Sequence, residues 1–186
     1  MTRRKIVIGA SIGAAVLGVA GLASLASHFG VLRADEDDDD EDDGSAAVAR
    51  GLRFAKVSLQ QGLAASEREG QPISAKFEID RGNNFQLSVY TSKDGGFSEV
   101  LVDYSTGEIK NVSKITAGDD LAAAQAQSSA MAKAKTSLRD VVEKTLAGSA
   151  GFRAVGVVPN LKDGRAVASV LIIKGEDFQI VNQPLD

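Results

Sequence analysis

The sequence predicts an α+β fold made of two tandem repeats, each a helix followed by a three-stranded antiparallel β-meander, with the repeats sharing a core. Three observations lead to this prediction. Apolar residues recur at helical spacing, strands with alternating apolar and polar residues follow them, and the same order returns in the second half of the chain. One helix with three strands buries too little surface to be stable alone, so we expect a shared core.

The first repeat is expected over residues 46–117. Its helix covers residues 46–66, where apolar residues recur at spacings of three and four, namely Val48, Leu52, Ala55, Leu59 and Leu63. Gly70 and Pro72 end this helix. Three strands with alternating patterns follow, separated by turns rich in Asn, Asp and Gly; they span residues 73–79, 85–89 and 97–103.

The second repeat is expected over residues 118–186. A long Ala-rich helix begins at Asp119 or Asp120 and continues to Gly148, with one apolar face formed by Met131, Ala134, Leu138, Val141 and Thr145. Strands are predicted around residues 152–158, 166–173 and 178–181. The middle strand, 166–173, is apolar at nearly every position, which favours it as the interface between the repeats.

Residue matches between the two halves support a duplication. Ser58-Leu59 matches Ser137-Leu138 at an offset of 79 residues, and Phe97 and Val100 match Phe178 and Val181 at an offset of 81 residues. An insertion of two residues between helix and sheet reconciles the two offsets.

Residues 1–34 are predicted to be a signal peptide or an N-terminal membrane anchor. Arg3, Arg4 and Lys5 precede an uncharged run of 21 residues from Ile6 to Ala26. A basic start, an apolar stretch and small residues near Ala26 form a secretory signal pattern, and about 20 residues also suffice to span a bilayer. Cleavage near Ala26 or Ala34 and retention as an anchor both stay open, and both place the remainder of the chain outside the cytoplasm.

Residues 35–45 are predicted to be a disordered acidic linker, because Asp35 to Asp43 are nine consecutive acidic residues. An EF-hand alignment with Gly44 at loop position 6 places Arg50 at position 12, where calcium binding needs a bidentate Glu. The calcium motif therefore fails, and the linker acts as a spacer between membrane and domain.

Composition excludes several classes of function. Four of the 21 Lys and Arg residues and nine of the 25 Asp and Glu residues precede Gly44, which leaves 17 basic against 16 acidic residues, so no basic excess supports nucleic-acid binding. The chain has no Cys and a single histidine, His28, at the end of the apolar run. Nucleophilic catalysis that uses His or Cys and zinc sites built from these residues are thus not expected. The Gly-rich phosphate-binding loop with its following Lys-Ser/Thr is missing too, and we predict no enzyme activity, no cofactor and no metal site.

The segment Glu99–Ile109, with its Val-Asp-x-x-Thr-Gly-x-Ile ending, resembles the closing segment of a PepSY domain. Val57-Ser58-Leu59-Gln60-Gln61 and the paired strands that reach Tyr90 extend the resemblance over about residues 57–110, with a degenerate second copy over about 137–185. PepSY domains occur in propeptides of thermolysin-like metallopeptidases, where they are thought to inhibit, and in exported or membrane-anchored bacterial proteins. The family assigns no catalytic residues.

The resemblance implies a non-catalytic periplasmic or otherwise extracytoplasmic protein, secreted or held at the inner membrane by its N-terminal segment. Its modules are expected to bind a protein partner, such as an envelope peptidase, and to inhibit or modulate it. The candidate partner-binding segment consists of Val102, Asp103, Tyr104, Thr106, Gly107 and Ile109. The alternative is a structural or cation-buffering envelope protein that acts through its acidic run.

We expect residues 44–186 to fold without the acidic run, because periodic apolar patterning begins only after Gly44. Thermal melts of the protein with and without Asp35–Asp43 should be equally cooperative and have comparable midpoints. A shortened protein that is molten or unfolded would contradict this expectation.

Overall fold

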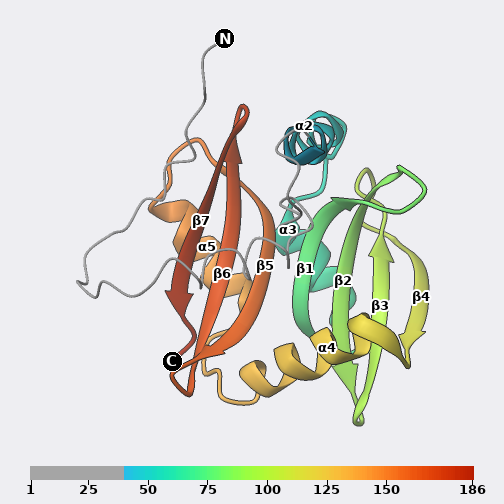
Figure 1. Cartoon of the computed structure of the whole chain (residues 1–186), viewed down its shortest axis with the longest axis vertical. Helices are drawn as coiled ribbons and strands as arrows, with labels where there is room; N and C mark the ends of the chain where they lie inside the picture. Colours follow the sequence, from blue (N-terminus) through green and yellow to red (C-terminus); the bar gives the residue numbers. More distant parts are fainter. Residues whose placement is uncertain (1–39) are drawn as a thin grey trace.

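The computed structural model describes residues 40–186, which form one antiparallel sheet of seven strands. The strands lie in the order β4-β3-β2-β1-β5-β6-β7 (Figure 1). Their bounds are Gln71–Ile79 for β1, Phe85–Lys93 for β2, Gly96–Val102 for β3, Ile109–Ile115 for β4, Arg153–Lys162 for β5, Arg165–Lys174 for β6 and Asp177–Pro184 for β7.

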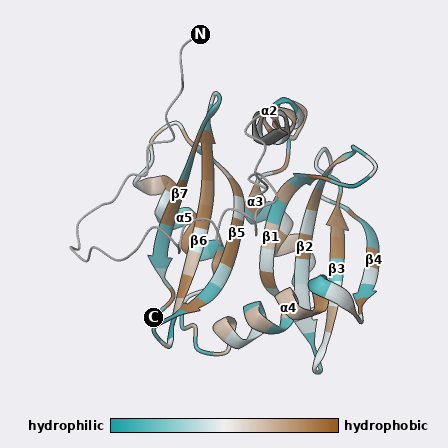
Figure 2. Ribbon diagram, viewed as in Figure 1, coloured by the Kyte–Doolittle hydropathy of each residue, from teal (hydrophilic) through white to brown (hydrophobic). Residues whose placement is uncertain are grey.

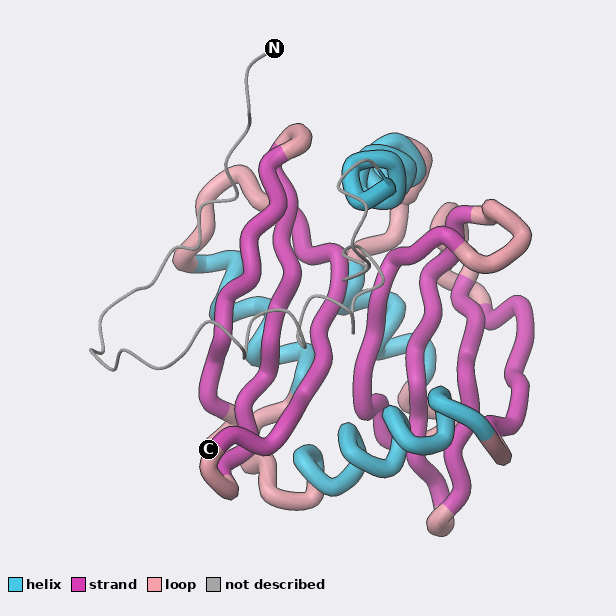
Figure 3. The backbone as a smooth tube through the Cα atoms, viewed as in Figure 1, coloured by secondary structure: helices cyan, strands magenta, loops and turns pink. Residues whose placement is uncertain are grey.

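Four helices pack around the described sheet: α2 (Asp40–Leu52), α3 (Leu59–Ser66), α4 (Gly118–Met131) and α5 (Leu138–Ala147). Helices α3 and α5 cover one face, whereas α4 crosses the opposite face over β1, β2 and β5 (Figures 1 and 3). We call these the α3–α5 face and the α4 face. Helix α2 packs against β1 and β2 at one end of the sheet.

The prediction of two tandem repeats of a helix and three strands is wrong. The chain is α+β, but β1 pairs directly with β5, through Ala75 with Val157 and Lys76 with Gly156, so that all the strands belong to one continuous sheet. Strand β4 has no place in the predicted unit, and each of the two predicted helices is divided in two. A three-stranded sheet leaves an unpaired edge, and joining two such edges satisfies their backbone groups while extending the core.

The predicted helix over residues 46–66 is interrupted. Helix α2 ends at Leu52, and α3 begins only at Leu59, with Ser58 as its N-cap. The Ser58 side chain accepts the backbone N–H of Gln61, and the Gln61 side chain accepts the N–H of Ser58, which together form a capping box. A continuous helical pattern therefore spans two helices, since the cap fixes a new start.

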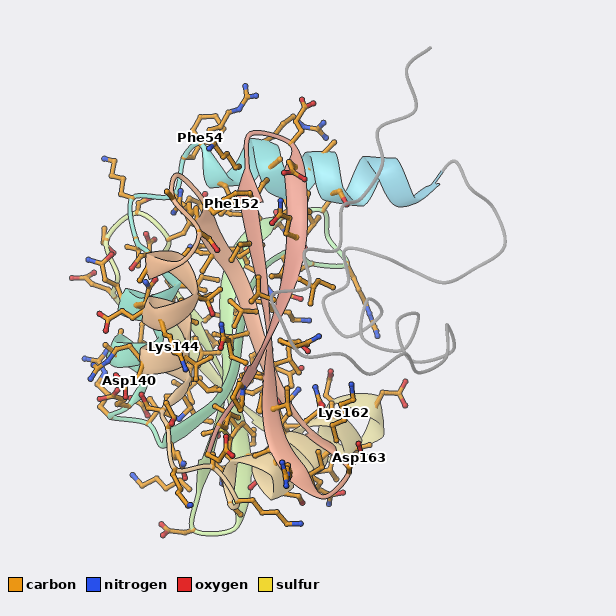
Figure 4. All side chains as sticks on the ribbon, turned by 90° about the vertical axis from the view of Figure 1, so that its left-hand side faces the viewer. Phe54, Asp140, Lys144, Phe152, Lys162 and Asp163 are labelled. Atoms are coloured by element: carbon orange, nitrogen blue, oxygen red, sulfur yellow. The ribbon has the colours of Figure 1, made fainter. Side chains whose placement is uncertain are left out.

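The long helix predicted up to Gly148 is likewise two helices. Helix α4 ends at Met131, and Ser137 caps α5 by accepting the N–H of Asp140 at 3.1 Å. Asp140 and Lys144 project from α5 into solvent (Figure 4). The break allows α4 and α5 to lie on opposite faces of the sheet, which one straight helix cannot do.

The core lies mainly on the α3–α5 face. Its largest fully buried side chains are those of Phe77, Leu59, Leu63, Ile73, Leu87, Ile172 and Leu185. Gly62 permits α3 to approach β2 closely, because a Cβ atom at this position would lie 2.5 Å from the Leu87 side chain. Strand β6 is buried along most of its length and is mostly hydrophobic (Figure 2). It pairs with β5 and β7, however, so the prediction that residues 166–173 join the two halves is wrong.

The N-terminal predictions lie largely outside the described residues. This holds for the signal or anchor at 1–34 and for residues 35–39 of the acidic linker, whereas α2 begins at Asp40, inside the predicted linker. None of the helices described from residue 40 onward is long and apolar enough to cross a membrane.

Arg153, the first residue of β5, binds the connection between α2 and α3. Its guanidinium donates to the carbonyl oxygens of Leu52 at 2.8 Å, Ala55 at 3.0 Å and Val57 at 2.9 Å. It also lies over the Phe77 ring, 5.5 Å from the ring centroid. One side chain thus satisfies three carbonyl groups of a non-helical segment and packs on the core.

We predict that Arg153→Ala lowers the free energy of unfolding by about 2–4 kcal/mol, because it removes several charge-assisted hydrogen bonds at once. Arg153→Lys should recover only part of this loss, since an ammonium cannot reproduce the planar fork. The measurement is denaturant unfolding, with Arg165→Ala on β6 as the exposed control, which we expect to change stability by less than about 0.5 kcal/mol. Equal losses in the Arg153 and Arg165 variants would contradict the assignment.

Candidate functional site

The predicted partner-binding segment, Val102–Ile109, forms the tight turn between β3 and β4. The Asp103 carboxylate accepts the backbone N–H groups of Ser105 at 2.7 Å and Thr106 at 3.0 Å. The Asp103 backbone exchanges two further hydrogen bonds across the turn, accepting from Gly107 and donating to Glu108, both at 2.8 Å. Gly107 has a φ of 81°, a conformation that favours glycine. The Asp-x-x-Thr-Gly sequence is therefore explained by the geometry of the turn.

Tyr104 attaches this turn to the start of α3. Its carbonyl oxygen accepts the backbone N–H groups of Lys56 at 2.9 Å and Val57 at 3.0 Å. Its ring packs edge-to-face on Phe85, with centroids 5.1 Å apart, and Phe85 stacks on Phe77. Tyr104 thus links the β3–β4 turn, the α2–α3 connection and the core.

The candidate residues do not form one exposed face. Val102 is buried, whereas Asp103, Tyr104, Gly107 and Ile109 are half-buried and Thr106 is exposed. Most of these side chains contribute to the turn or to the core, which leaves Thr106 as the candidate side chain most accessible to a partner. That this segment contacts a partner stays a prediction.

Strand β4, which follows this turn, is one edge of the sheet. It pairs only with β3, and its residues 110–114 are exposed. Val112 has 42% of its surface exposed. Lys110 and Lys114 lie along the same strand, and Lys110 approaches the Asp103 carboxylate at 3.8 Å. The sequence analysis predicted no strand here, because no apolar alternation distinguishes residues 109–115.

A groove that the sequence did not reveal lies between α4 and the sheet. Its volume is about 590 Å³. The floor consists of side chains from β1, β2 and β5, and the roof consists of side chains from α4; the lining residues are Ser74, Lys76, Ser88, Tyr90, Val158, Asp119, Asp120, Ala122, Ala123, Ala126 and Gln127. We call this site the α4 groove.

Hydrogen bonds order the polar side chains of the α4 groove. Ser74 Oγ donates to Gln127 Oε1 at 2.8 Å, and Ser88 Oγ donates to the Glu99 carboxylate at 2.6 Å. Tyr90 donates its phenol proton to Asp120 Oδ1 at 2.8 Å. Burial is the main cause that raises the pKa of Tyr90, and the nearby Asp120 carboxylate raises it further. The phenol therefore stays protonated and donates at physiological pH.

Lys76 introduces the positive charge of the groove, and Glu78 neutralises it. Lys76 Nζ lies 2.6 Å from the Glu78 carboxylate, whose other oxygen accepts from Gln86 at 3.0 Å. In the part of the chain from residue 40 onward, no cluster of three or more His, Cys, Asp or Glu residues is arranged to hold a metal ion.

No protein-family model matches this sequence, and no curated protein matches it. Among solved structures, the chain is similar to a crystal structure described as that of a putative lipoprotein from Clostridium difficile 630. The two chains share 11% sequence identity with a TM-score of 0.39, over 65% of this chain and 79% of the other. A TM-score below 0.5 carries no argument about function, and none of these comparisons tests the resemblance to PepSY domains.

We predict that Asp103 contributes to acid denaturation. The backbone N–H groups of Ser105 and Thr106, together with the charge of Lys110, lower the pKa of this carboxyl below its usual value of about 3.9. Because the folded pKa lies below the unfolded one, the carboxylate stabilises the fold above about pH 4, and this contribution is lost as the pH falls through the folded pKa.

Thermal melts between pH 7 and pH 2 test this prediction. Asp103→Asn should start from a lower melting temperature at pH 7 and lose less of it on acidification than the unsubstituted protein. Asp80→Asn should behave in the same direction, since backbone N–H groups in the β1–β2 turn lower the pKa of Asp80 too. Parallel pH profiles for Asp103→Asn and the unsubstituted protein would refute the role of Asp103.

Proposed function

We propose that this chain is a non-catalytic, exported envelope protein that binds a protein partner by adding a strand to β4. The observation that carries the proposal is the exposed edge at β4, whose backbone pairs on one side only. Such an edge offers unpaired N–H and C=O groups to an extended peptide, which would become the eighth strand of the sheet.

The side chains of β4 give this edge its selectivity. Lys110 and Lys114 protect a free edge against self-association and at the same time favour a partner segment with acidic side chains. Val112, between them, provides an apolar contact. Strand addition by a segment of a peptidase, or next to its cleft, would occlude that cleft by stoichiometric binding, which is the inhibitory role that the PepSY resemblance implies.

Of the four ionisable groups with a shifted pKa in the described part of the chain, Tyr90 lies in the α4 groove and the other three serve the fold. Asp80 and Asp103 close turns, and Arg153 holds backbone carbonyl groups, so the geometry of each is explained by the fold. Export is supported by the basic and apolar N-terminal sequence of residues 3–26. Periplasmic localisation, with or without a retained inner-membrane anchor, belongs to the same proposal.

The partner-binding test uses two substitutions matched for exposure. Val112 on β4 and Leu161 on β5 have 42% and 41% of their surface exposed. Val112→Asp should weaken the capture of envelope proteins, or the inhibition of envelope metallopeptidases, at least tenfold, because it puts a repulsive charge in the new strand pair. Leu161→Asp should leave both unchanged. Equal losses in the two variants would show that the effect is not specific to β4.

Hydrogen exchange separates strand addition from other modes of binding. Bound partner should protect backbone amides within residues 109–115, since half of them point away from β3. Protection confined to other strands would overturn the β4 proposal. Activity that requires Asp35–Asp43 and vanishes on addition of calcium would favour the acidic run instead.

A further inference from the structure

The α4 groove has a polar floor where a sheet covered by a helix usually packs apolar side chains. Ser74, Ser88 and Gln127 have only 7%, 1% and 6% of their surface exposed, respectively. Opposite the floor, α4 presents the short side chains of Ala122, Ala123 and Ala126, which leave the space open. Ser74 and Ser88 are hydrogen-bonded to Gln127 and Glu99, so their burial is satisfied within the protein. The space left open beside them by the alanines is the feature that a ligand could fill.

The buried groups retain hydrogen-bonding capacity toward the groove. Gln127 uses Oε1 to accept from Ser74, and its Nε2 carries two N–H donors that make no hydrogen bond to the described residues. Because no buried side-chain nitrogen or oxygen atom of these residues lacks a partner, this Nε2 is accessible from the groove. The hydroxyl oxygens of Ser74 and Ser88 donate their protons elsewhere and keep lone pairs that can accept. The groove therefore offers both donors and acceptors to a polar molecule.

The charge of the lining is negative. Asp119 and Asp120 lie on the first turn of α4, and Tyr90 bonds one oxygen of Asp120. The one cation of the lining, Lys76, is paired with Glu78. A ligand that enters the groove thus meets the exposed carboxylates of Asp119 and Asp120, and the three N–H donors of a primary ammonium match acceptors of this kind.

We propose that the α4 groove binds a molecule with a primary ammonium group and an oxygen at its other end, the ammonium at Asp120 and the oxygen at Gln127 Nε2, which lie about two helical turns apart on α4. A volume of about 590 Å³ lies within the range of small-molecule sites and admits a monosaccharide or an amino acid with room for water or for a larger ligand. This site lies on the α4 face and is separate from the edge proposed to bind protein.

The test uses the full chain and glucosamine as probe, with glucose as its neutral counterpart. The chain has no Trp and two tyrosines, so Tyr104→Phe leaves Tyr90 as the sole emitter, hydrogen-bonded inside the groove. We expect glucosamine, but not glucose, to change the fluorescence of Tyr90 in a saturable way. Glucosamine should also shift the NMR signal of the Gln127 side-chain amide. A parallel titration with Nα-acetyl-lysine amide shows whether the groove also accepts the ammonium of a lysine side chain.

Matched variants identify the site. Asp120→Asn removes one charge while keeping an acceptor for Tyr90, and should weaken glucosamine binding about tenfold. Asp163→Asn, at the tip of the β5–β6 turn (Figure 4) and outside the groove, removes the same charge and should bind as the unsubstituted chain does. Ala123→Leu fills the groove and should abolish binding even if Asp120→Asn fails to fold.

Equal responses to glucosamine and glucose, a response that does not saturate, or unchanged binding in Asp120→Asn would overturn the proposal. The groove variants should leave partner capture at β4 intact, so failure at one site is distinguishable from failure at the other.

Discussion

Arg153 connects parts of the chain that lie almost 100 residues apart in the sequence, and the arrangement of the sheet depends on this contact. The pairing of β1 with β5 joins only Ala75 with Val157 and Lys76 with Gly156. Two residue pairs are a short strand pairing to join the two halves of a seven-stranded sheet. Arg153 reinforces it by holding the α2–α3 connection with three hydrogen bonds and by covering Phe77 of β1. The halves are therefore joined by a specific polar clamp above an apolar core.

The α2–α3 connection, which Arg153 binds, is also held by hydrogen bonds to the β3–β4 turn. Tyr104 O accepts the N–H groups of Lys56 and Val57, immediately before the Ser58 cap of α3. At α5, Leu185 O accepts the N–H groups of Lys135 and Thr136, immediately before the Ser137 cap. In both places a carbonyl after the third strand of a meander sets where the helix begins. For this reason residues 46–66 and 119–148 each form two helices, although their apolar residues recur at helical spacing throughout.

Local patterns in the sequence predicted the local structure well and its assembly poorly. Alternation placed the strands from residue 73 to 103, and the Ser58 and Ser137 matches fall on true helix caps. In the alternating strand 73–79, Ser74 and Lys76 are polar residues that the pattern would place toward solvent, although they line the groove beneath α4. Periodicity states which residues share a face, but not what covers that face, so the α4 groove was not predictable. The same limit applies to β4, whose mostly polar sequence shows no buried side.

The two proposed sites lie next to each other in the sequence. Strand β4 ends at Ile115 and α4 begins at Gly118, so only two residues separate the edge from the helix whose first turn carries Asp119 and Asp120. Ala117, the N-cap of α4, makes no side-chain hydrogen bond to the helix, and the start of α4 is therefore held by packing and by the Tyr90–Asp120 bond. A ligand bound at Asp120 would add contacts at this point, and a strand added to β4 would pair with the residues just before it. If occupancy of one site changes the affinity of the other, the change must be reciprocal, because the two binding free energies are then thermodynamically linked.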